Sequence, residues 1–414
     1  MEKKLVTLVG CLCLILTLAL GAPKMAGAKG APDTIKVSSV LSFGGMFAGL
    51  GKMCKNSYEL WLEKVNAKGG IYVKEYGKKI PVEIKYYDDE SNGARTQFQL
   101  DVANNWGAVA NLGGIGCSSF EMGTPMAQKN KLVWIGPGCG GWMPHQLGNK
   151  WMFNTLEKTK DFGLILEAIS KMPEATRPKK VAIFEINQLD CNEAALFWRA
   201  AAKMHDFEVV YDNKYAAGTK DFSAMITAAK GAGADILLSY PTPVGGPTII
   251  KQMKMLDWNP KVIYMSRAPM TPKFSDLGRL SDYVTCISSW LPGLNFPGNQ
   301  EFVQEYTKKY GSTPAVLAGP AYVAAQVLED AITRAGSLDR KAIRDAMAAS
   351  NLMTIGGVVK YMPNGARDEC GLYVFQWYDN KTKVVETAEW CKPYVDKGYI
   401  DLGQFKLAKP WSER

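Results

Sequence analysis

The sequence predicts an α/β protein of two doubly wound lobes, each a parallel sheet with helices on both faces. Strand-like and helix-like segments alternate along the chain from Ile35 onward. The alternation occurs in two blocks, one before about residue 155 and one after it. At 414 residues the chain is also too long for one compact core, so two lobes are expected.

The first block begins with the strand-like run "TIKVSSVLS" and continues with a helix. That helix is predicted by apolar residues at helical spacing, Tyr58, Leu62 and Val65, followed by a Gly-Gly stop. The later strands are short apolar or alternating runs bounded by glycine and proline. Strands are expected at 34–42, 80–90, 108–115 and 132–138, and helices at 56–71 and 94–106.

The second block repeats the same alternation, and the pattern then changes after Val284. From there on we expect three helices with little strand between them, and a final β-hairpin around "DNKT" in 370–391. The second block is expected to have strands at 179–186, 207–215, 234–241 and 261–266 and helices at 192–205, 221–233 and 246–257, and the three later helices are expected at 299–311, 319–336 and 339–349.

The first 28 residues are expected to be a signal peptide. "MEKK" is basic, "LVTLVGCLCLILTLALG" is apolar, and "AGA" at Ala26–Ala28 is a small-residue cleavage site. No later stretch approaches the roughly 18 apolar residues needed to span a bilayer. The mature protein is therefore expected to be exported and soluble, beginning near Lys29, in a compartment where disulfides form.

Seven of the nine cysteines follow the expected cleavage site, so at least one thiol stays unpaired within the chain. Centring the final hairpin on Asn380 and Lys381 places Tyr378 opposite Lys383 and Cys370 opposite Cys391. Residues directly opposite in a hairpin have Cβ atoms about 4.5–5.5 Å apart, close to disulfide range. We therefore predict a disulfide between Cys370 and Cys391.

Composition argues against several classes of function. The formal net charge is +9, but basic and acidic residues are interleaved, so no nucleic-acid-binding face is expected. With only His145 and His205 and no CxxC, neither a histidine zinc site nor a Ser-His-Asp enzyme is expected, and no metal or cofactor. The one couple that suggests an enzyme is Asp190 with Cys191, whose thiolate would need a neighbouring cation.

Four segments, taken in order, carry a family resemblance. "LSFGGMFAGLGKMCKNSYELWLEKVNAKGGI" resembles the opening of the leucine/isoleucine/valine-binding family of ABC-transporter substrate-binding proteins, with Met46 where the family usually has proline. "IPVEIKYYDDESNGARTQFQLDVANNW" resembles its next strand and Asp-Asp turn. "GPAYVAAQVLEDAITRAGS" resembles a late helix, and "GLYVFQWYDN" resembles the closing strand. The ordered match covers nearly the whole mature chain.

The resemblance implies two lobes joined by three crossovers, near 151–154, 287–290 and 363–367, with the ligand between them. Lobe 1 would comprise 33–154 and 289–365, and lobe 2 would comprise 155–288 and 366–414. It implies a monomeric periplasmic protein, not an enzyme, that captures a small carboxylate-bearing ligand (an organic or aromatic acid, or an amino acid) for an ABC permease in the inner membrane. A ligand sensor that presents to a receptor is an alternative, and a secreted enzyme is a weaker one.

"NLGGIGCSSFEMGTP" (111–125) places the first lobe's candidate residues at a helix start. Ser118 and Glu121 form an S-x-x-E pattern that predicts a capping box. The resemblance instead implies that a hydroxyl here binds the ligand carboxylate, and the two roles can coexist on neighbouring residues. The resemblance nominates Cys117, Ser118 and Ser119 at the helix start, Gly138, Cys139 and Gly140 in the next cleft loop through their backbone, and Phe47 and Leu50 as residues that face the ligand or pack under their loop.

In the second lobe, the resemblance places Asp190 or Cys191 where an aromatic residue usually covers the ligand, and Tyr240 and Thr242 in another cleft loop. Arg267 stands near where amino-acid binders supply an acid for the ligand ammonium. A guanidinium cannot accept from an ammonium but pairs well with a carboxylate. We therefore expect an organic acid with an apolar or aromatic body ahead of a branched-chain amino acid. Two alternatives remain, an ammonium bound by Asp190 and a purely structural salt bridge for Arg267.

Overall fold

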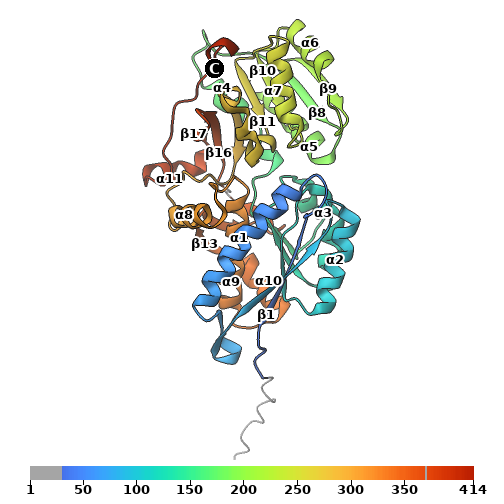
Figure 1. The fold of residues 1–414 in the computed structure, drawn as a ribbon, viewed down its shortest axis with the longest axis vertical. Helices are drawn as coiled ribbons and strands as arrows, with labels where there is room; N and C mark the ends of the chain where they lie inside the picture. The colour runs from blue at the N-terminus through green and yellow to red at the C-terminus, as the bar shows by residue number, and fades with distance from the viewer. Residues whose placement is uncertain (1–29, 369–370) are drawn as a thin grey trace, which may run out of the picture. The chain divides into compact units, whose positions relative to one another are not determined.

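The structure, a computed structural model, describes residues 30–368 and 371–414. The predicted signal peptide (1–28) and Cys370 lie outside the described residues. Within those residues the chain forms two lobes, each built on its own sheet (Figure 1). No helix in this part of the chain combines the length and apolar character needed to cross a membrane.

The first lobe is built on a parallel sheet of order β4-β1-β5-β6-β7. Every residue of β5 and β6 is buried, as expected for parallel strands covered on both faces. Figure 1 shows α1 and α9 on one side of this sheet and α2 and α3 on the other. The elements are β1 (Ile35–Leu41), α1 (Ala48–Ala67), β4 (Val82–Asp88), α2 (Gly93–Trp106), β5 (Ala110–Leu112), α3 (Cys117–Asn130), β6 (Val133–Gly136), β7 (Met152–Asn154), α8 (Asn299–Tyr310), α9 (Ala318–Ala335) and α10 (Arg340–Ala348).

The second lobe is built on a seven-stranded sheet of order β17-β16-β12-β11-β10-β8-β9. Strands β8 to β12 pair in parallel, whereas β16 and β17 add an antiparallel edge. The elements are α4 (Leu164–Ser170), β8 (Lys180–Ile186), α5 (Leu189–Met204), β9 (Glu208–Tyr215), α6 (Ser223–Gly231), β10 (Ile236–Ser239), α7 (Gly245–Met255), β11 (Val262–Met265), β12 (Val284–Ser288), β16 (Tyr373–Tyr378), β17 (Lys381–Thr387) and α11 (Lys392–Asp396). The predicted fold class is therefore confirmed.

As predicted, the three later helices α8, α9 and α10 follow one another in the described chain with no strand between them, but β12 before them was not predicted. β12 begins at Val284 and is buried at all of its residues, but it is too short to show a periodic pattern. A small sheet of β13 (Asn351–Thr354), β14 (Gly357–Tyr361) and β15 (Arg367–Asp368) was also missed, as was the hairpin of β2 (Ile71–Val73) and β3 (Lys78–Ile80).

The predicted register of the final hairpin is also corrected. Tyr378 pairs with Lys381, not Lys383, so the turn consists of Asp379 and Asn380. Both turn residues have positive φ, 49° and 58°, which is the backbone of a type I′ two-residue turn. The strand β17 ends at Thr387 and Cys391 lies in the 3-10 turn that follows. Because Cys370 lies outside the described residues, its disulfide with Cys391 stays a prediction.

Hydrogen bonds join the segments predicted to cross between the lobes. Asn154 donates from its backbone nitrogen to the carbonyl of Gly365 at 3.1 Å. Ser289 donates from its backbone nitrogen to the carboxylate of Glu157 at 2.8 Å. The first crossing segment therefore contacts the third, and Glu157, three residues after the first, contacts the second. The lobe boundaries themselves remain a prediction.

A disulfide joins two loops at the top of the first sheet. Cys117, the first residue of α3, is bonded to Cys139 in the loop after β6, with Cα atoms 4.8 Å apart. Both residues were nominated as ligand contacts, and this pairing was not predicted.

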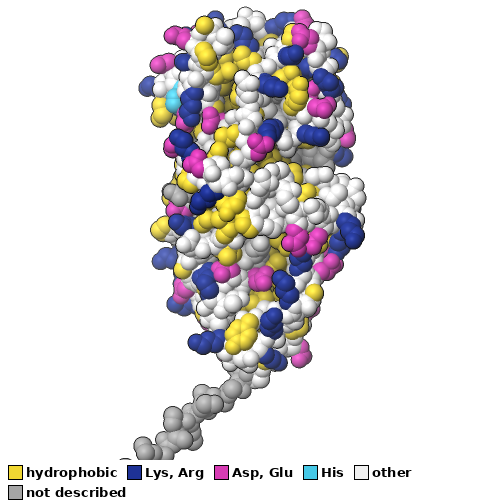
Figure 2. All heavy atoms as spheres, turned by 90° about the vertical axis from the view of Figure 1, so that its left-hand side faces the viewer, with side chains coloured by type: hydrophobic (Ala, Val, Ile, Leu, Met, Phe, Trp, Pro, Cys, Tyr) yellow, Lys and Arg dark blue, Asp and Glu magenta, His cyan; other side chains and the backbone are white. Residues whose placement is uncertain are grey.

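On the face drawn in Figure 2, basic and acidic side chains are interspersed and form no continuous patch of one sign.

The disulfide allows a first prediction. It closes a loop with a sequence separation of 22, so the chain-entropy model gives a stabilisation of about 3 kcal/mol. The double variant Cys117→Ala/Cys139→Ala is expected to lose that much free energy of unfolding in urea, whereas Cys286→Ala, which removes a buried free thiol, controls for lost packing. Equal losses of unfolding free energy in the double variant and in Cys286→Ala would contradict a disulfide between Cys117 and Cys139.

Helix α1 packs against the chain after β1 at Gly51, which allows a second prediction. A Cβ at Gly51 would lie 1.8 Å from the carbonyl oxygen of Ser42, whereas a Cβ at Gly49 would meet nothing within 4 Å. Gly51→Ala is expected to cost about 1–3 kcal/mol by overpacking. Gly49→Ala in the same helix is expected to stabilise by up to about 1 kcal/mol. Urea denaturation measures both, and the same sign of change in both would show this packing to be wrong.

Candidate functional site

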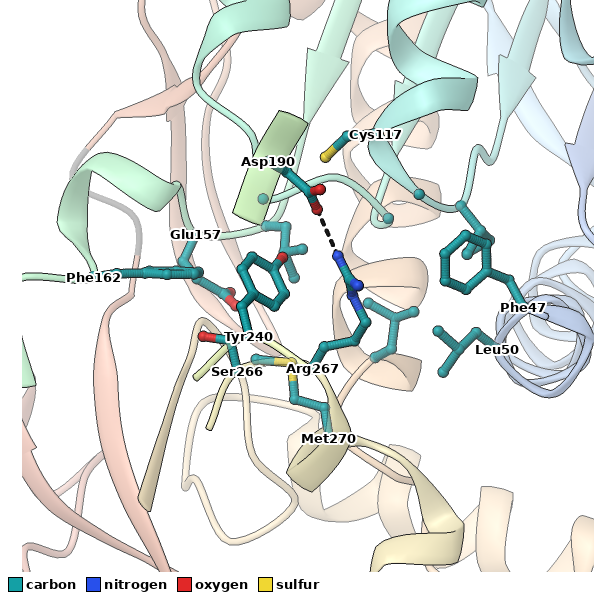
Figure 3. Close-up of a pocket in the computed structure, with 16 residues that line it drawn as sticks. Phe47, Leu50, Cys117, Glu157, Phe162, Asp190, Tyr240, Ser266, Arg267 and Met270 are labelled. Carbon is teal, nitrogen blue, oxygen red and sulfur yellow. Dashed lines mark hydrogen bonds and ion pairs between the residues drawn. The ribbon is translucent and has the colours of Figure 1, made fainter. Parts of the chain in front are cut away.

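A pocket lies between the two lobes, at the carboxyl ends of their parallel strands. Its walls come from loops after β1, β5 and β6 in the first lobe and after β8, β10 and β11 in the second. This is where doubly wound sheets bind their ligands. The pocket has a volume of about 570 Å³ including space open to solvent, and its lining residues are Phe47, Leu50, Ile115, Gly116, Cys117, Gly138, Gly140, Leu156, Glu157, Phe162, Asp190, Tyr240, Ser266, Arg267, Met270 and Leu317 (Figure 3).

Glycines shape the first-lobe wall. Gly116 has a φ of 80°, and a Cβ there would lie 2.6 Å from the Phe47 ring. Gly116 is the N-cap of α3, which has no side-chain cap, so the predicted capping role of Ser118 was wrong. Glycine readily adopts a positive φ, so Gly116 takes the N-cap position. The helix therefore begins at Cys117, one residue before Ser118. The N–H groups of the first turn therefore have no side-chain acceptor and are available to an anion.

Arg267 forms the charged centre of the pocket (Figure 3). Its Nη2 lies 2.6 Å from Oδ2 of Asp190, and the two side chains are only 12% and 8% exposed. The guanidinium also stacks over the Tyr240 ring, 4.3 Å from its centroid. Burial would lower the pKa of Arg267, but Asp190, Tyr240 and Cys191 together raise it above the ordinary value. The side chain is therefore a cation, held by an ion pair and an aromatic face.

The second terminal nitrogen of this guanidinium is unsatisfied. Nη1 of Arg267 is buried and has no hydrogen-bond partner within residues 30–368 and 371–414. Arg267 also has a φ of 63°, a conformation that is uncommon outside glycine. Strained residues cluster at functional sites, and a buried donor without a partner costs about 1–3 kcal/mol, or more when charged. Both features are those of a site that binds an external acceptor.

The surroundings of Cys191 disfavour a nucleophilic thiolate. Its Sγ lies 4.0 Å from Nη2 of Arg267, so a neighbouring cation is present. Burial is nevertheless the largest influence, and with the nearby Asp190 it raises the pKa of Cys191 well above the ordinary value. The thiol therefore stays protonated at neutral pH, which removes the main support for a secreted enzyme.

The other nominated residues lie in different surroundings. The hydroxyl of Ser119 is buried against Asp89 and Thr96 rather than lining the pocket. Ser118 is exposed and lines a cavity at the pocket mouth. Thr242 accepts from the backbone nitrogen of Gly245 at 2.9 Å, at the start of α7. Cys139 is held in the disulfide, and its neighbours Gly138 and Gly140 line the pocket, as do Phe47, Leu50 and Tyr240.

Several lining residues were not predicted. Glu157 is fully buried beside the first crossing segment, and burial raises its pKa. Ser266 and Met270 lie within three residues of Arg267 in the sequence, so the nomination of Arg267 could have been extended to the whole loop after β11. Leu156, Phe162 and Leu317 carry no sequence mark beyond being apolar, and their position follows only from the fold.

Comparison with known proteins agrees with this geometry. Residues 34–382 match the family model described as "Periplasmic binding protein". The Leu/Ile/Val-binding protein homolog 7 of Brucella abortus is 25% identical over 386 residues, covering 88% of this chain and 94% of the relative.

Two solved structures share the fold. A branched-chain amino acid transporter substrate binding protein from Streptococcus pneumoniae, in complex with isoleucine, has a TM-score of 0.77 at 20% identity, covering 86% of this chain and 99% of that one. A solute binding protein of an ABC transporter from Rhodopseudomonas palustris, in complex with 3,4-dihydroxy benzoic acid, has a TM-score of 0.75 at 18% identity. The match covers 92% of this chain and 100% of that one. With its fold, its interlobe pocket and a family match over most of its length, this chain belongs to the periplasmic binding protein family.

Proposed function

We propose that this protein, once exported to the periplasm, captures a small carboxylate-bearing ligand between its lobes and delivers it to an ABC permease in the inner membrane. The observation that carries the proposal is the buried Nη1 of Arg267, which has no partner in the described chain and belongs to a residue that lines the pocket. A carboxylate oxygen supplies the missing acceptor. The first turn of α3 adds N–H groups and the positive end of its dipole.

The walls define the rest of the ligand. Phe47, Leu50, Leu156, Phe162 and Leu317 present apolar surface, and such a pocket with few polar anchors suits a compact apolar or aromatic body. We place an organic or aromatic acid first because Arg267 offers a cation. The ligands of the two solved relatives, isoleucine and 3,4-dihydroxy benzoic acid, both carry a carboxylate.

An amino acid is the second candidate, and a specific observation favours it. Asp190 and Glu157 both line the pocket, and either carboxylate group can accept from an ammonium. Asp190 is already bonded to Arg267, so an ammonium would share that carboxylate. A sensor that presents the same ligand to a receptor would use the same pocket. A neighbouring permease and ATPase gene pair favours transport, and an adjacent histidine kinase gene favours sensing.

The head-group chemistry gives a third prediction, tested by calorimetry with benzoate and leucine. Arg267→Met is expected to weaken binding of whichever of these two compounds the wild-type protein binds by about 1.5–3 kcal/mol, or roughly 10- to 150-fold. Arg95→Met, which removes an exposed ion pair with Glu90, is expected to change binding little. Unchanged affinity in Arg267→Met, in protein shown to be folded by circular dichroism, would contradict the proposal.

Asp190→Asn separates the two ligand classes. The amide keeps an oxygen for Nη2 of Arg267 but removes a negative charge from the pocket. Binding of a simple acid is then expected to strengthen or stay the same, whereas binding of an amino acid is expected to weaken at least tenfold. Weaker binding of both classes would show that Asp190 only maintains the fold of the site.

A fourth prediction concerns closure of the lobes. Glu193 on α5 accepts from the backbone nitrogens of Trp142 and Met143 in the first lobe at 2.6 and 2.8 Å, so the lobes are in direct contact beside the pocket. Ligand is expected to shift the population to this closed form through contacts that only the closed form completes. Small-angle scattering should show a smaller radius of gyration at saturating ligand, and Arg267→Met at the same concentration should not. An unchanged radius in the wild type would argue against closure.

A further inference from the structure

A second and larger cavity adjoins the ligand pocket. Its volume is about 1070 Å³ against about 570 Å³ for the pocket, both including space open to solvent. Its apolar lining comes largely from prolines and Trp377, and hydroxyl groups and Lys381 complete it. The residues that line it are Pro269, Met270, Thr271, Ser275, Pro292, Gly293, Ser312, Thr313, Pro314, Ala315, Val316, Trp377, Asn380, Lys381 and Thr382.

Met270 lines both the ligand pocket and the second cavity. Leu317 also lines the pocket, and its neighbour Val316 lines the second cavity. Met270 and the 316–317 segment therefore form the partition. Figure 3 shows the Met270 side chain entering the pocket beside Arg267, from the 3-10 turn Ala268–Met270. The partition thus lies next to the cation proposed to hold the ligand head group.

We propose that Met270 is a movable partition that determines how long a ligand the protein accepts. When the ligand is a carboxylate with an elongated alkyl or aryl-alkyl tail, the Met270 side chain rotates aside and the tail enters the second cavity. This inference rests on the proposed function, because the head group must be held at Arg267. Short ligands leave Met270 in place and fill the pocket alone.

The chemistry of the partition suits this role. Methionine is unbranched, with three rotatable side-chain bonds, so it can change shape at lower cost than a branched residue in the same place. Met270 is buried, with 9% of its surface exposed, so it fills space between the two cavities. Beyond it, Trp377 is anchored by its indole nitrogen to the carbonyl of Pro269 at 3.2 Å, which makes a fixed apolar wall. Such a wall favours an apolar tail over a second charged group.

Two series of ligands of increasing length test the inference whichever head group is preferred. The acids are benzoate, 3-phenylpropanoate and 4-phenylbutanoate, and the amino acids are leucine, phenylalanine and homophenylalanine. Calorimetry with Met270→Ala is expected to raise affinity for the longest member at least tenfold relative to the shortest. Ala315→Phe, which fills the second cavity from its half-buried wall, is expected to lower affinity for the longest member tenfold and leave the shortest unchanged.

Met253→Ala is the matched control, because Met253 is fully buried in α7 of the same lobe and lines neither cavity. It is expected to keep the wild-type order of affinities even if it lowers stability. If the shortest ligands bind but Met270→Ala and Ala315→Phe change long and short ligands by equal factors, the partition is wrong and the proposed function stands. If no member of either series binds the wild-type protein, both proposals fail.

Discussion

A buried cation with an unpaired donor is the constraint on which the pocket depends. A guanidinium removed from water needs its charge and its N–H groups compensated. Asp190 and Tyr240 compensate part of this requirement for Arg267, and Nη1 is left without an acceptor in the described chain. We therefore propose that the site is prepared for an anion before any ligand arrives. Preorganised polar groups of this kind favour binding because little has to be reordered when the ligand enters.

The first lobe contributes rigidity instead of charge. Gly138 allows close backbone approach, since a Cβ there would lie 2.1 Å from the carbonyl oxygen of Gly114, and Gly116 allows the Phe47 ring to pack against it. The Cys117–Cys139 disulfide then ties the start of α3 to the loop after β6. The resemblance led us to expect a hydroxyl group at the start of α3 and backbone contacts from the loop after β6. The structure has a disulfide between these two segments. We therefore propose that the first lobe would hold a ligand through backbone N–H groups, and that the polar side chains of the site come mainly from the second lobe.

Regular periodic segments were predictable, and features that depend on one backbone conformation or on distant contacts were not. The apolar runs of β8, β10 and β11 lie between glycine, proline and helical patterns, so their order was evident. The hairpin register failed because Asp379 and Asn380 take positive φ, which spacing does not encode. The same reason misplaced the start of α3. Arg267 was nominated from the sequence, but its bond to Asp190, 77 residues away, appears only once the sheet brings two loops together.

We propose that Nη1 of Arg267 receives a ligand carboxylate. A crystal structure of the protein purified without unfolding, with whatever ligand it retains, would show this contact. We expect a carboxylate oxygen at roughly 2.7–2.9 Å from Nη1 of Arg267, the distance of a charge-assisted hydrogen bond. A ligand that has no carboxylate, or one whose carboxylate lies away from Arg267 while Nη1 faces only protein, would contradict it.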